Sequence, residues 1–410
     1  MRVERRSLLK AALAPAAIGS SSLALTSSAA QASDERIDVY AAQLMRASGT
    51  PGLALAFGRE EEPSLELYLG TKNTDTTAPV DASTVFQAAS ISKMVFALGV
   101  RELSRRGGLL LDKPLVTYLR PEYLPEWDGM DTITAHHVLS HTSGLPNWLD
   151  ENGDQGEPLT IVPGLFRYSG EAYFWLQLVV EKLTGKGLNA FMRDVVFEPA
   201  VMTSSAFVWD SSWADRMAWG HEQGRVSGDQ GLRGVLGLVE PLAKEWAKPL
   251  TEWSHDEWLA AGARLSPETE HRKITFQNAA ASLVTTATDL YRFMRFARST
   301  RNDNADPALN MFAPTVRIAV GVDNWWGLGC SLERLPEGGM IAGHEGNNVI
   351  FRAYCGMKLE TGETLVVLTN GDGGLGVYER LVRRLMGCDQ LSFLANLNPN
   401  HSYLAHGDGA

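Results

Sequence analysis

Cysteine is scarce in this sequence. The 410 residues include three cysteines, Cys330, Cys355 and Cys388. An odd number allows one disulfide at most and leaves one thiol unpaired. The dense disulfide framework that holds many small secreted domains together is therefore excluded.

The motifs of metal and nucleotide enzymes are missing as well. The nine histidines form no HExxH pair, and there is no CxxC pair, no GxxxxGK[ST] loop and no GxSxG nucleophile elbow. The adjacent His136 and His137 would point in different directions on a helix. We therefore expect no metal site and no cofactor.

Positive charge and long apolar runs are also limited. Lys and Arg number 37 against 48 Asp and Glu, a net charge of −11, which argues against a nucleic-acid partner. After residue 32, no stretch approaches the ~18 to 20 consecutive apolar residues of a membrane-spanning helix. We expect no membrane span in the mature chain, while the sequence leaves the oligomeric state open.

The first 32 residues differ from the rest. Arg2, Arg5, Arg6 and Lys10 precede an Ala/Leu/Ser-rich segment that ends in Ala-Gln-Ala. This pattern predicts a signal peptide over residues 1–32. The Arg pair resembles a twin-arginine export signal, and a Sec-type signal with a chance Arg pair is the alternative. We expect an exported protein, periplasmic or secreted.

Strand patterns occur near both ends of the remaining chain and helical patterns between them. Short apolar runs separated by turn residues predict an N-terminal hairpin and C-terminal strands. The predicted strands are 53–57, 65–69, 325–335, 340–342, 349–359 and 363–368. Predicted helices at 34–47, from Ser90 to about Arg105, and at 377–386 flank them.

These patterns predict one domain of the α/β class, α+β type. An antiparallel sheet built from both chain ends is flanked by helices and carries an inserted, mainly helical domain. We expect the folded domain to cover residues 33–390, followed by a tail at 391–410. Its sheet part is predicted over 33–105 and 275–390, and its helical insert over 106–274.

Ser90 and Lys93 form an SxxK motif at the start of a strongly apolar helix. On a helix, positions i and i+3 share a face, so the Lys93 amine can reach the Ser90 hydroxyl. The motif alone is weak, because residues 7–10 match it as well. The apolar context strengthens it, since a buried lysine without a task would be costly to desolvate.

The segment Phe86–Lys93 resembles the nucleophile segment of the β-lactamase-related serine hydrolases, the family of class C β-lactamases, DD-peptidases and several esterases. Residues 133–146 are similar to its ITxxHLLxHTSGLP segment, and residues 278–293 resemble its AGGLxST…DLxRF segment. The resemblance covers about residues 40 to 385. It implies a β-lactamase/transpeptidase-like fold.

The resemblance also implies roles for individual residues. Tyr168 falls at the family's Y-x-N tyrosine and would share its phenol proton with Ser90 and Lys93. His344 falls where relatives carry K-T-G or H-x-G, and it would orient a substrate carboxylate or the Tyr168 hydroxyl. The backbone N–H groups of Ser90 and Asn347 would form the oxyanion hole, with Gly346 permitting close approach.

Two positions depart from the β-lactamase pattern. Gly170 replaces the asparagine whose amide would hold a substrate amide, and His344 replaces a permanently charged lysine. Both departures favour an esterase or amidase that forms an acyl-enzyme on Ser90, acting on a small-molecule ester, amide or peptide. A D-Ala-D-Ala carboxypeptidase or β-lactamase is the first alternative. A catalytically silent module that binds peptidoglycan or another ligand is the second.

Overall fold

A computed structural model describes residues 36–124, 126–127, 129–149, 164–228, 232–266, 277–301, 306–318 and 323–388. The predicted signal peptide and C-terminal tail lie outside these residues. The chain divides into two compact units, residues 1–40 and 41–410. The first unit is described from Arg36 and contributes the opening of helix α2 (Ile37–Ser48). The sheet, all other described helices and the predicted site belong to the second.

The second unit is organised around a nine-stranded sheet in which every neighbouring pair is antiparallel. Its order is β3-β2-β1-β13-β12-β11-β10-β9-β8. The bounds are β1 Gly52–Gly58, β2 Leu65–Asn73, β3 Ala78–Pro79, β8 Val316–Arg317, β9 Asn324–Trp326, β10 Ser331–Arg334, β11 Met340–Asn347, β12 Arg352–Lys358 and β13 Thr364–Thr369. Because β1 pairs with β13, both chain ends build one sheet, which confirms the predicted fold class.

Glycine and turn residues set strand limits that differ from the prediction. The predicted strand 325–335 is two strands, β9 and β10, because the chain turns between them at Gly329 with φ 87°. Strand β11 continues past the predicted end at residue 342 to Asn347, so His344 lies within this strand, near its end. Val349, predicted to be in a strand, lies in the turn before β12 with φ 60°.

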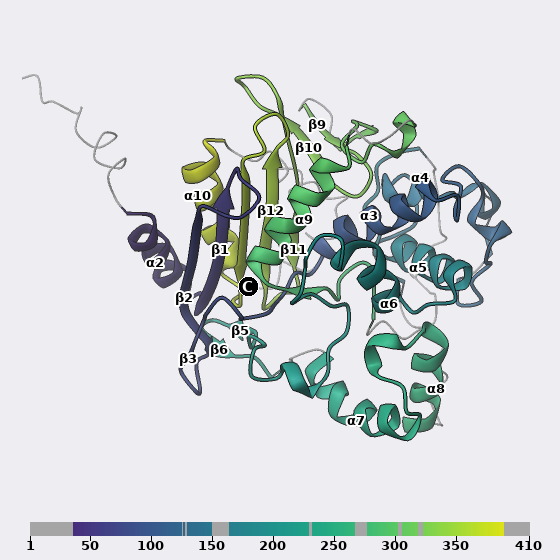
Figure 1. The fold of residues 1–410 in the computed structure, drawn as a ribbon, viewed down its shortest axis with the longest axis horizontal. Helices are drawn as coiled ribbons and strands as arrows, with labels where there is room; N and C mark the ends of the chain where they lie inside the picture. Colours follow the sequence, from purple (N-terminus) through teal and green to yellow (C-terminus); the bar gives the residue numbers. More distant parts are fainter. Residues whose placement is uncertain are drawn as a thin grey trace, which may run out of the picture. The chain divides into compact units, whose positions relative to one another are not determined.

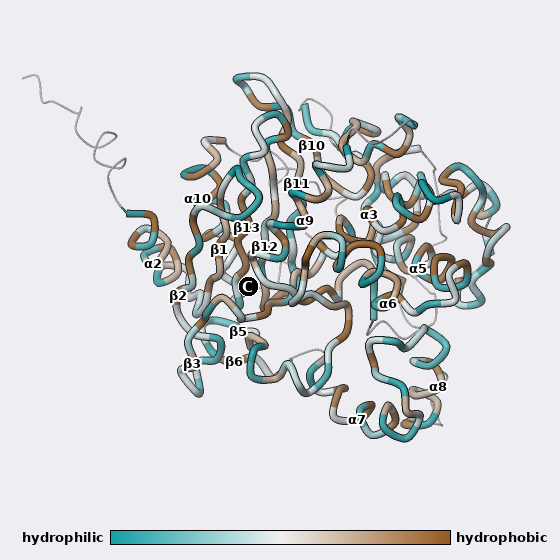
Figure 2. Tube along the Cα trace, in the orientation of Figure 1, coloured by the Kyte–Doolittle hydropathy of each residue, from teal (hydrophilic) through white to brown (hydrophobic). Residues whose placement is uncertain are grey.

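The two faces of the sheet pack against different helices. Side chains alternate between faces along a strand. Cys355 of β12 belongs to the core shared with α3 (Ile91–Arg105) and α9 (Ala287–Ser299). The preceding residue, Tyr354, points to the opposite face and stacks on Tyr378 of α10 (Gly374–Met386). In Figure 1, α9 crosses in front of the strands, and Figure 2 shows it alternating between polar and apolar positions.

The region between the two halves of the sheet is mainly helical. Its helices are α4 Ala135–Leu139, α5 Gly170–Thr184, α6 Leu188–Met192, α7 Leu232–Glu245 and α8 His255–Leu265, with short helical turns at 115–117, 130–132, 193–197, 211–213 and 250–252. A small hairpin, β5 (His221–Glu222) with β6 (Arg225–Val226), was not predicted. Trp209, Trp253 and Trp258 are buried in a separate core.

None of the helices in the described ranges combines the length and apolarity needed to cross a membrane.

Candidate active site

Ser90 lies at the N-terminus of α3, just after a strained turn. Ala89 adopts a left-handed φ of 48°, and Ser90 is the N-cap residue with 5% of its surface exposed. The strand pair β4 (Phe86–Gln87) and β7 (Val284–Thr285) anchors this segment. Leu283 accepts a hydrogen bond from the Ala88 N–H at 2.8 Å and donates its own N–H to Ser92 Oγ at 2.9 Å. The nucleophile turn is therefore fixed from both sides.

Lys93 lies one helical turn after Ser90 and points back to it. Its Nζ lies 3.2 Å from Ser90 Oγ and donates a hydrogen bond to the Ala280 carbonyl at 2.9 Å. The side chain is 1% exposed, and burial lowers the pKa of Lys93 well below its ordinary value of 10.5. A neutral amine in this position can accept the Ser90 proton. The sequence did not indicate Ala280 as the partner that aims the amine.

Tyr168 covers the other side of the Lys93 amine. Lys93 Nζ lies 4.5 Å from the centre of the Tyr168 ring, and the tyrosine is 6% exposed. Trp326 packs edge-on against this ring, with centroids 6.0 Å apart. The structure therefore brings Ser90, Lys93 and Tyr168 together from α3 and from the segment before α5.

His141 holds the backbone on both sides of Tyr168. Its carbonyl accepts from the Arg167 N–H at 2.7 Å, and its Nδ1 accepts from the Ser169 N–H at 3.1 Å. Its ring lies against the Tyr168 ring, with centroids 4.3 Å apart, and the residue is fully buried with φ 55°. His141, which belongs to the HTSGLP segment, is thus a positioning residue for Tyr168.

For the ester hydrolysis expected from the sequence, His141→Ala should lower kcat for p-nitrophenyl butyrate by about 10 to 100-fold with little change in KM, because a misplaced Tyr168 would impair the proton transfer that the resemblance implies for it. His141→Asn should recover part of kcat, since its amide oxygen can accept from Ser169 and asparagine tolerates positive φ. Steady-state kinetics and melting temperatures of both variants check this. Equal kcat losses in the two variants would show that His141 is only a packing residue.

The end of β11 brings the predicted substrate-binding residues to the nucleophile turn. Strand β10 ends its pairing at Gly343, so residues 344–347 extend past it. A Cβ added to Gly346 would lie 2.3 Å from the Ala88 carbonyl oxygen, so β11 can approach this closely because residue 346 is glycine. Asn347 follows directly.

His344 lies beside the tyrosine, with the two ring centroids 6.2 Å apart. It is 6% exposed, and its Nδ1 lies 2.6 Å from the Glu345 carbonyl oxygen. An Nδ1–H that donates to this carbonyl holds the ring in place beside Tyr168. Such a ring can orient a hydroxyl or accept from a substrate donor.

Gly170 is the first residue of α5, and its surroundings were not predicted. Its N–H donates to Asn147 Oδ1 at 2.9 Å. A Cβ at this position would lie 2.5 Å from the indole of Trp148. The indole thus fills the space beside Gly170. No sequence motif indicated this contact between a loop residue and a helix terminus.

Metal-ligating groups do not cluster in the described part of the chain, where no set of three or more His, Cys, Asp or Glu side chains could hold an ion. Cys330, Cys355 and Cys388 are buried, and none of them forms a disulfide within the described part of the chain. Burial raises the pKa values of Cys330 and Cys355. These thiols are therefore inert core residues.

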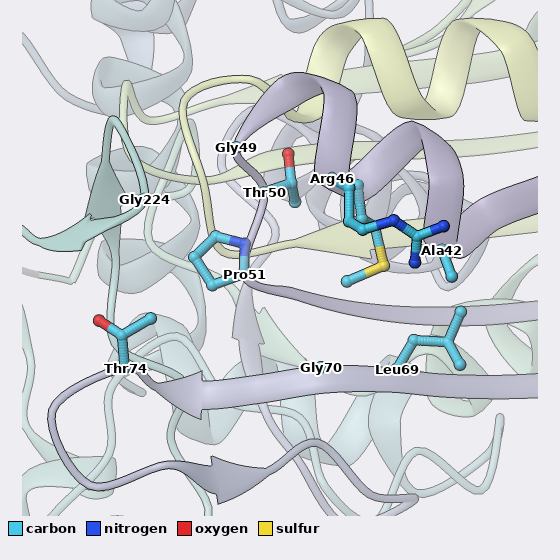
Figure 3. A pocket seen from close by; sticks show the side chains of 10 residues that line it. Ala42, Arg46, Gly49, Thr50, Pro51, Leu69, Gly70, Thr74 and Gly224 are labelled. Carbon is cyan, nitrogen blue, oxygen red and sulfur yellow. The ribbon is translucent and has the colours of Figure 1, made fainter.

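A separate pocket lies at the end of α2, against β1 and β2 (Figure 3). It shares no residue with the predicted site, and Arg46 is the one charged side chain among the residues lining it. Those residues are Ala42, Met45, Arg46, Gly49, Thr50, Pro51, Leu69, Gly70, Thr74 and Gly224.

Comparison with known proteins decides the family. Residues 37–385 match the model of the family described as Beta-lactamase. The chain belongs to the β-lactamase family. It is 27% identical to Esterase EstB of Burkholderia gladioli over 64% of this chain and 70% of that one. It is 25% identical to Penicillin-binding protein 4 of Amycolatopsis lactamdurans, over 82% and 85% of the two chains.

Solved structures show the same fold. D-alanine carboxypeptidase AmpC from Burkholderia cenocepacia superposes with a TM-score of 0.62 at 19% identity, over 84% of this chain and 96% of that one. A penicillin-binding protein homologue from Pyrococcus abyssi, described as octameric, also gives a TM-score of 0.62, at 18% identity over 86% and 77% of the chains. The protein is thus a serine hydrolase of the β-lactamase family.

Proposed function

We propose that this β-lactamase-family protein is an exported esterase that forms an acyl-enzyme on Ser90. The observation that carries the proposal is the buried Lys93 amine, whose Nζ lies 3.2 Å from Ser90 Oγ and whose pKa is lowered by burial. A lysine of this kind can serve as a base at neutral pH. Similarity to a protein named as an esterase supports the ester preference.

In the proposed reaction, Lys93 takes the Ser90 hydroxyl proton as Ser90 Oγ attacks the ester carbonyl carbon. The backbone N–H groups of Ser90 and Asn347 stabilise the resulting oxyanion. When the intermediate collapses, the C–O bond to the alcohol breaks and the proton passes to the leaving alkoxide through Lys93 and Tyr168. Water then attacks the acyl-enzyme while Lys93, neutral again, takes a proton from it through the Tyr168 hydroxyl. When this second intermediate collapses, the bond between the acyl carbon and Ser90 Oγ breaks, Lys93 returns the proton to Ser90 Oγ, and the acid is released.

Ester selectivity is proposed to follow from the two departures already described. Gly170 supplies no side-chain amide for a substrate amide, and His344 supplies no permanent positive charge for a carboxylate. Of the two relatives compared above, one is named an esterase and the other a penicillin-binding protein. Because of the second relative, a DD-peptidase or β-lactamase is the second candidate function.

Initial rates on three substrates separate these functions. Wild-type protein is compared on p-nitrophenyl butyrate, nitrocefin and a D-Ala-D-Ala peptide under identical conditions. An esterase hydrolyses the first and is nearly inactive on the other two, whereas a higher kcat/KM for nitrocefin or the peptide replaces the proposal with the second candidate. A silent binding module would hydrolyse none of them, and a serine-directed fluorophosphonate would not label Ser90.

We also propose that residues 1–32 direct export. The protein is expressed in two hosts, one with twin-arginine transport and one without it, and the N-terminus of the exported form is sequenced. The proposal expects a mature chain beginning at Ser33 that is not exported without the twin-arginine pathway. Export in both hosts indicates the Sec-type alternative, and an unprocessed chain in both hosts contradicts a signal peptide.

A further inference from the structure

The backbone before α5 determines the direction in which a side chain at position 170 would leave the chain. Ser169 is extended, with φ −144° and ψ 115°, so the side chains of residues 168 and 170 leave the chain on the same side. Tyr168 points to the Lys93 amine. A side chain at position 170 would therefore point to the same side as the Tyr168 ring.

The Trp148 indole occupies that space. A Cβ on Gly170 would lie 2.5 Å from Cζ2, 2.7 Å from Cη2 and 2.9 Å from Cε2 of this indole. The three atoms belong to the indole ring itself. The ring therefore occupies the place that a longer side chain at position 170 would take. Trp148 remains 36% exposed, so part of the ring is accessible.

Hydrogen bonds hold the chain on both sides of Trp148. Asn147 accepts from the Gly170 N–H through its side chain at 2.9 Å and from the Glu171 N–H through its carbonyl at 2.8 Å. The Leu149 N–H donates to Glu171 Oε2 at 3.0 Å. Because these bonds flank Trp148, the indole is held against the start of α5.

A second exposed apolar side chain lies beside the other half of the site. Val349 is two residues after Asn347 and is 64% exposed. Its backbone has a φ of 60°, which valine rarely adopts. The turn is closed by a bond from the Ile350 N–H to the Asn348 carbonyl at 2.7 Å, and the Asn348 amide donates to Gln87 Oε1 at 2.9 Å. Strain of this kind concentrates at functional sites.

We propose that the Trp148 indole is the specificity-determining wall that contacts the apolar part of the substrate next to the scissile ester bond. The inference rests on the proposed esterase function and names its substrate class: esters with an extended aliphatic or aromatic group. Such a group loses apolar surface to water when it lies on the indole. An amide in the same place would lose its water without gaining a partner from residue 170.

The test compares Trp148→Ala and Trp148→Phe on p-nitrophenyl acetate, butyrate and octanoate. When the acyl chain is the part that lies on the indole, kcat/KM of Trp148→Ala for octanoate should fall by roughly tenfold while that for acetate stays within about twofold. Trp148→Phe keeps an aromatic ring and should lie between. The matched control is Trp213→Ala. Trp213 is a half-buried tryptophan that lines another pocket, so this variant should leave the chain-length profile unchanged.

Two substrate series identify which side of the ester lies on the indole. One varies the acyl chain with a fixed p-nitrophenyl group, and the other varies the alcohol of alkyl butyrates. A chain-length-dependent loss in either series supports the proposal and names the side. An equal loss for short and long esters, or no loss in either variant, overturns it, because the indole then only supports the loop.

Failure of this inference and failure of the proposed function are distinguishable. Fluorophosphonate labelling of Ser90 and loss of ester turnover in Ser90→Ala are measured on the same preparations. If both hold and the chain-length profile of Trp148→Ala matches wild type, the inference alone is wrong. If ester turnover does not depend on Ser90, the proposed function is wrong and the inference is overturned with it.

Discussion

Lys93→Met lowers kcat/KM for p-nitrophenyl butyrate by about 10³-fold or more in our proposal, because the Ser90 hydroxyl loses the base 3.2 Å away. Methionine has a similar length and no polar atom to desolvate, so the buried site stays filled. The measurement is steady-state ester kinetics. A loss of less than about tenfold would show that another group deprotonates Ser90.

The stability of the same variant should move in the opposite direction. Burial lowers the pKa of Lys93 below its ordinary value of 10.5, so below pH 10.5 the unfolded chain binds a proton more readily than the folded chain. Lys93 therefore reduces the free energy of unfolding at neutral pH, and this cost disappears as pH rises to 10.5. Lys93→Met should melt at or above the wild-type temperature at pH 7, which separates lost chemistry from lost folding.

Gly346→Ala is expected to lower kcat by about 10² to 10³-fold, the loss found when one oxyanion-hole donor is removed. The added Cβ would lie 2.3 Å from the Ala88 carbonyl oxygen, a backbone atom that cannot rotate away. Strand β11 must then move away from the nucleophile turn, and the Asn347 N–H moves with it. Ester kinetics measure kcat, and the melting temperature reports the accompanying loss of stability.

Gly376→Ala provides the matched control for that variant. It is also a glycine near the C-terminal end of the chain, but a Cβ there meets only the flexible Arg380 guanidinium at 3.4 Å. Its activity should match wild type. Wild-type activity in Gly346→Ala would contradict the proposal that the end of β11 supplies an oxyanion donor.

Local sequence patterns predicted what depends on neighbouring positions. The i, i+3 spacing of Ser90 and Lys93 determines their contact once a helix begins at residue 91. The short apolar runs near both chain ends predicted strands, and two of these strands pair as β1 with β13. Turn chemistry was harder to predict, since Gly329 divides β9 from β10 in a run that otherwise resembles one strand.

Contacts between distant segments could not be predicted in this way. Trp148 against Gly170, and His141 on both sides of Tyr168, join residues more than twenty positions apart through irregular backbone. No periodicity describes such segments, because their conformation depends on tertiary hydrogen bonds. The motif containing His141 was visible, but its positioning role required the structure.

The most direct test of the central claim is the rate of p-nitrophenyl butyrate hydrolysis by Ser90→Ala beside wild type. Ser90 as the only nucleophile predicts a loss of about 10⁴-fold or more, with an unchanged melting temperature. A Ser90→Ala rate within tenfold of wild type would contradict an acyl-enzyme on Ser90.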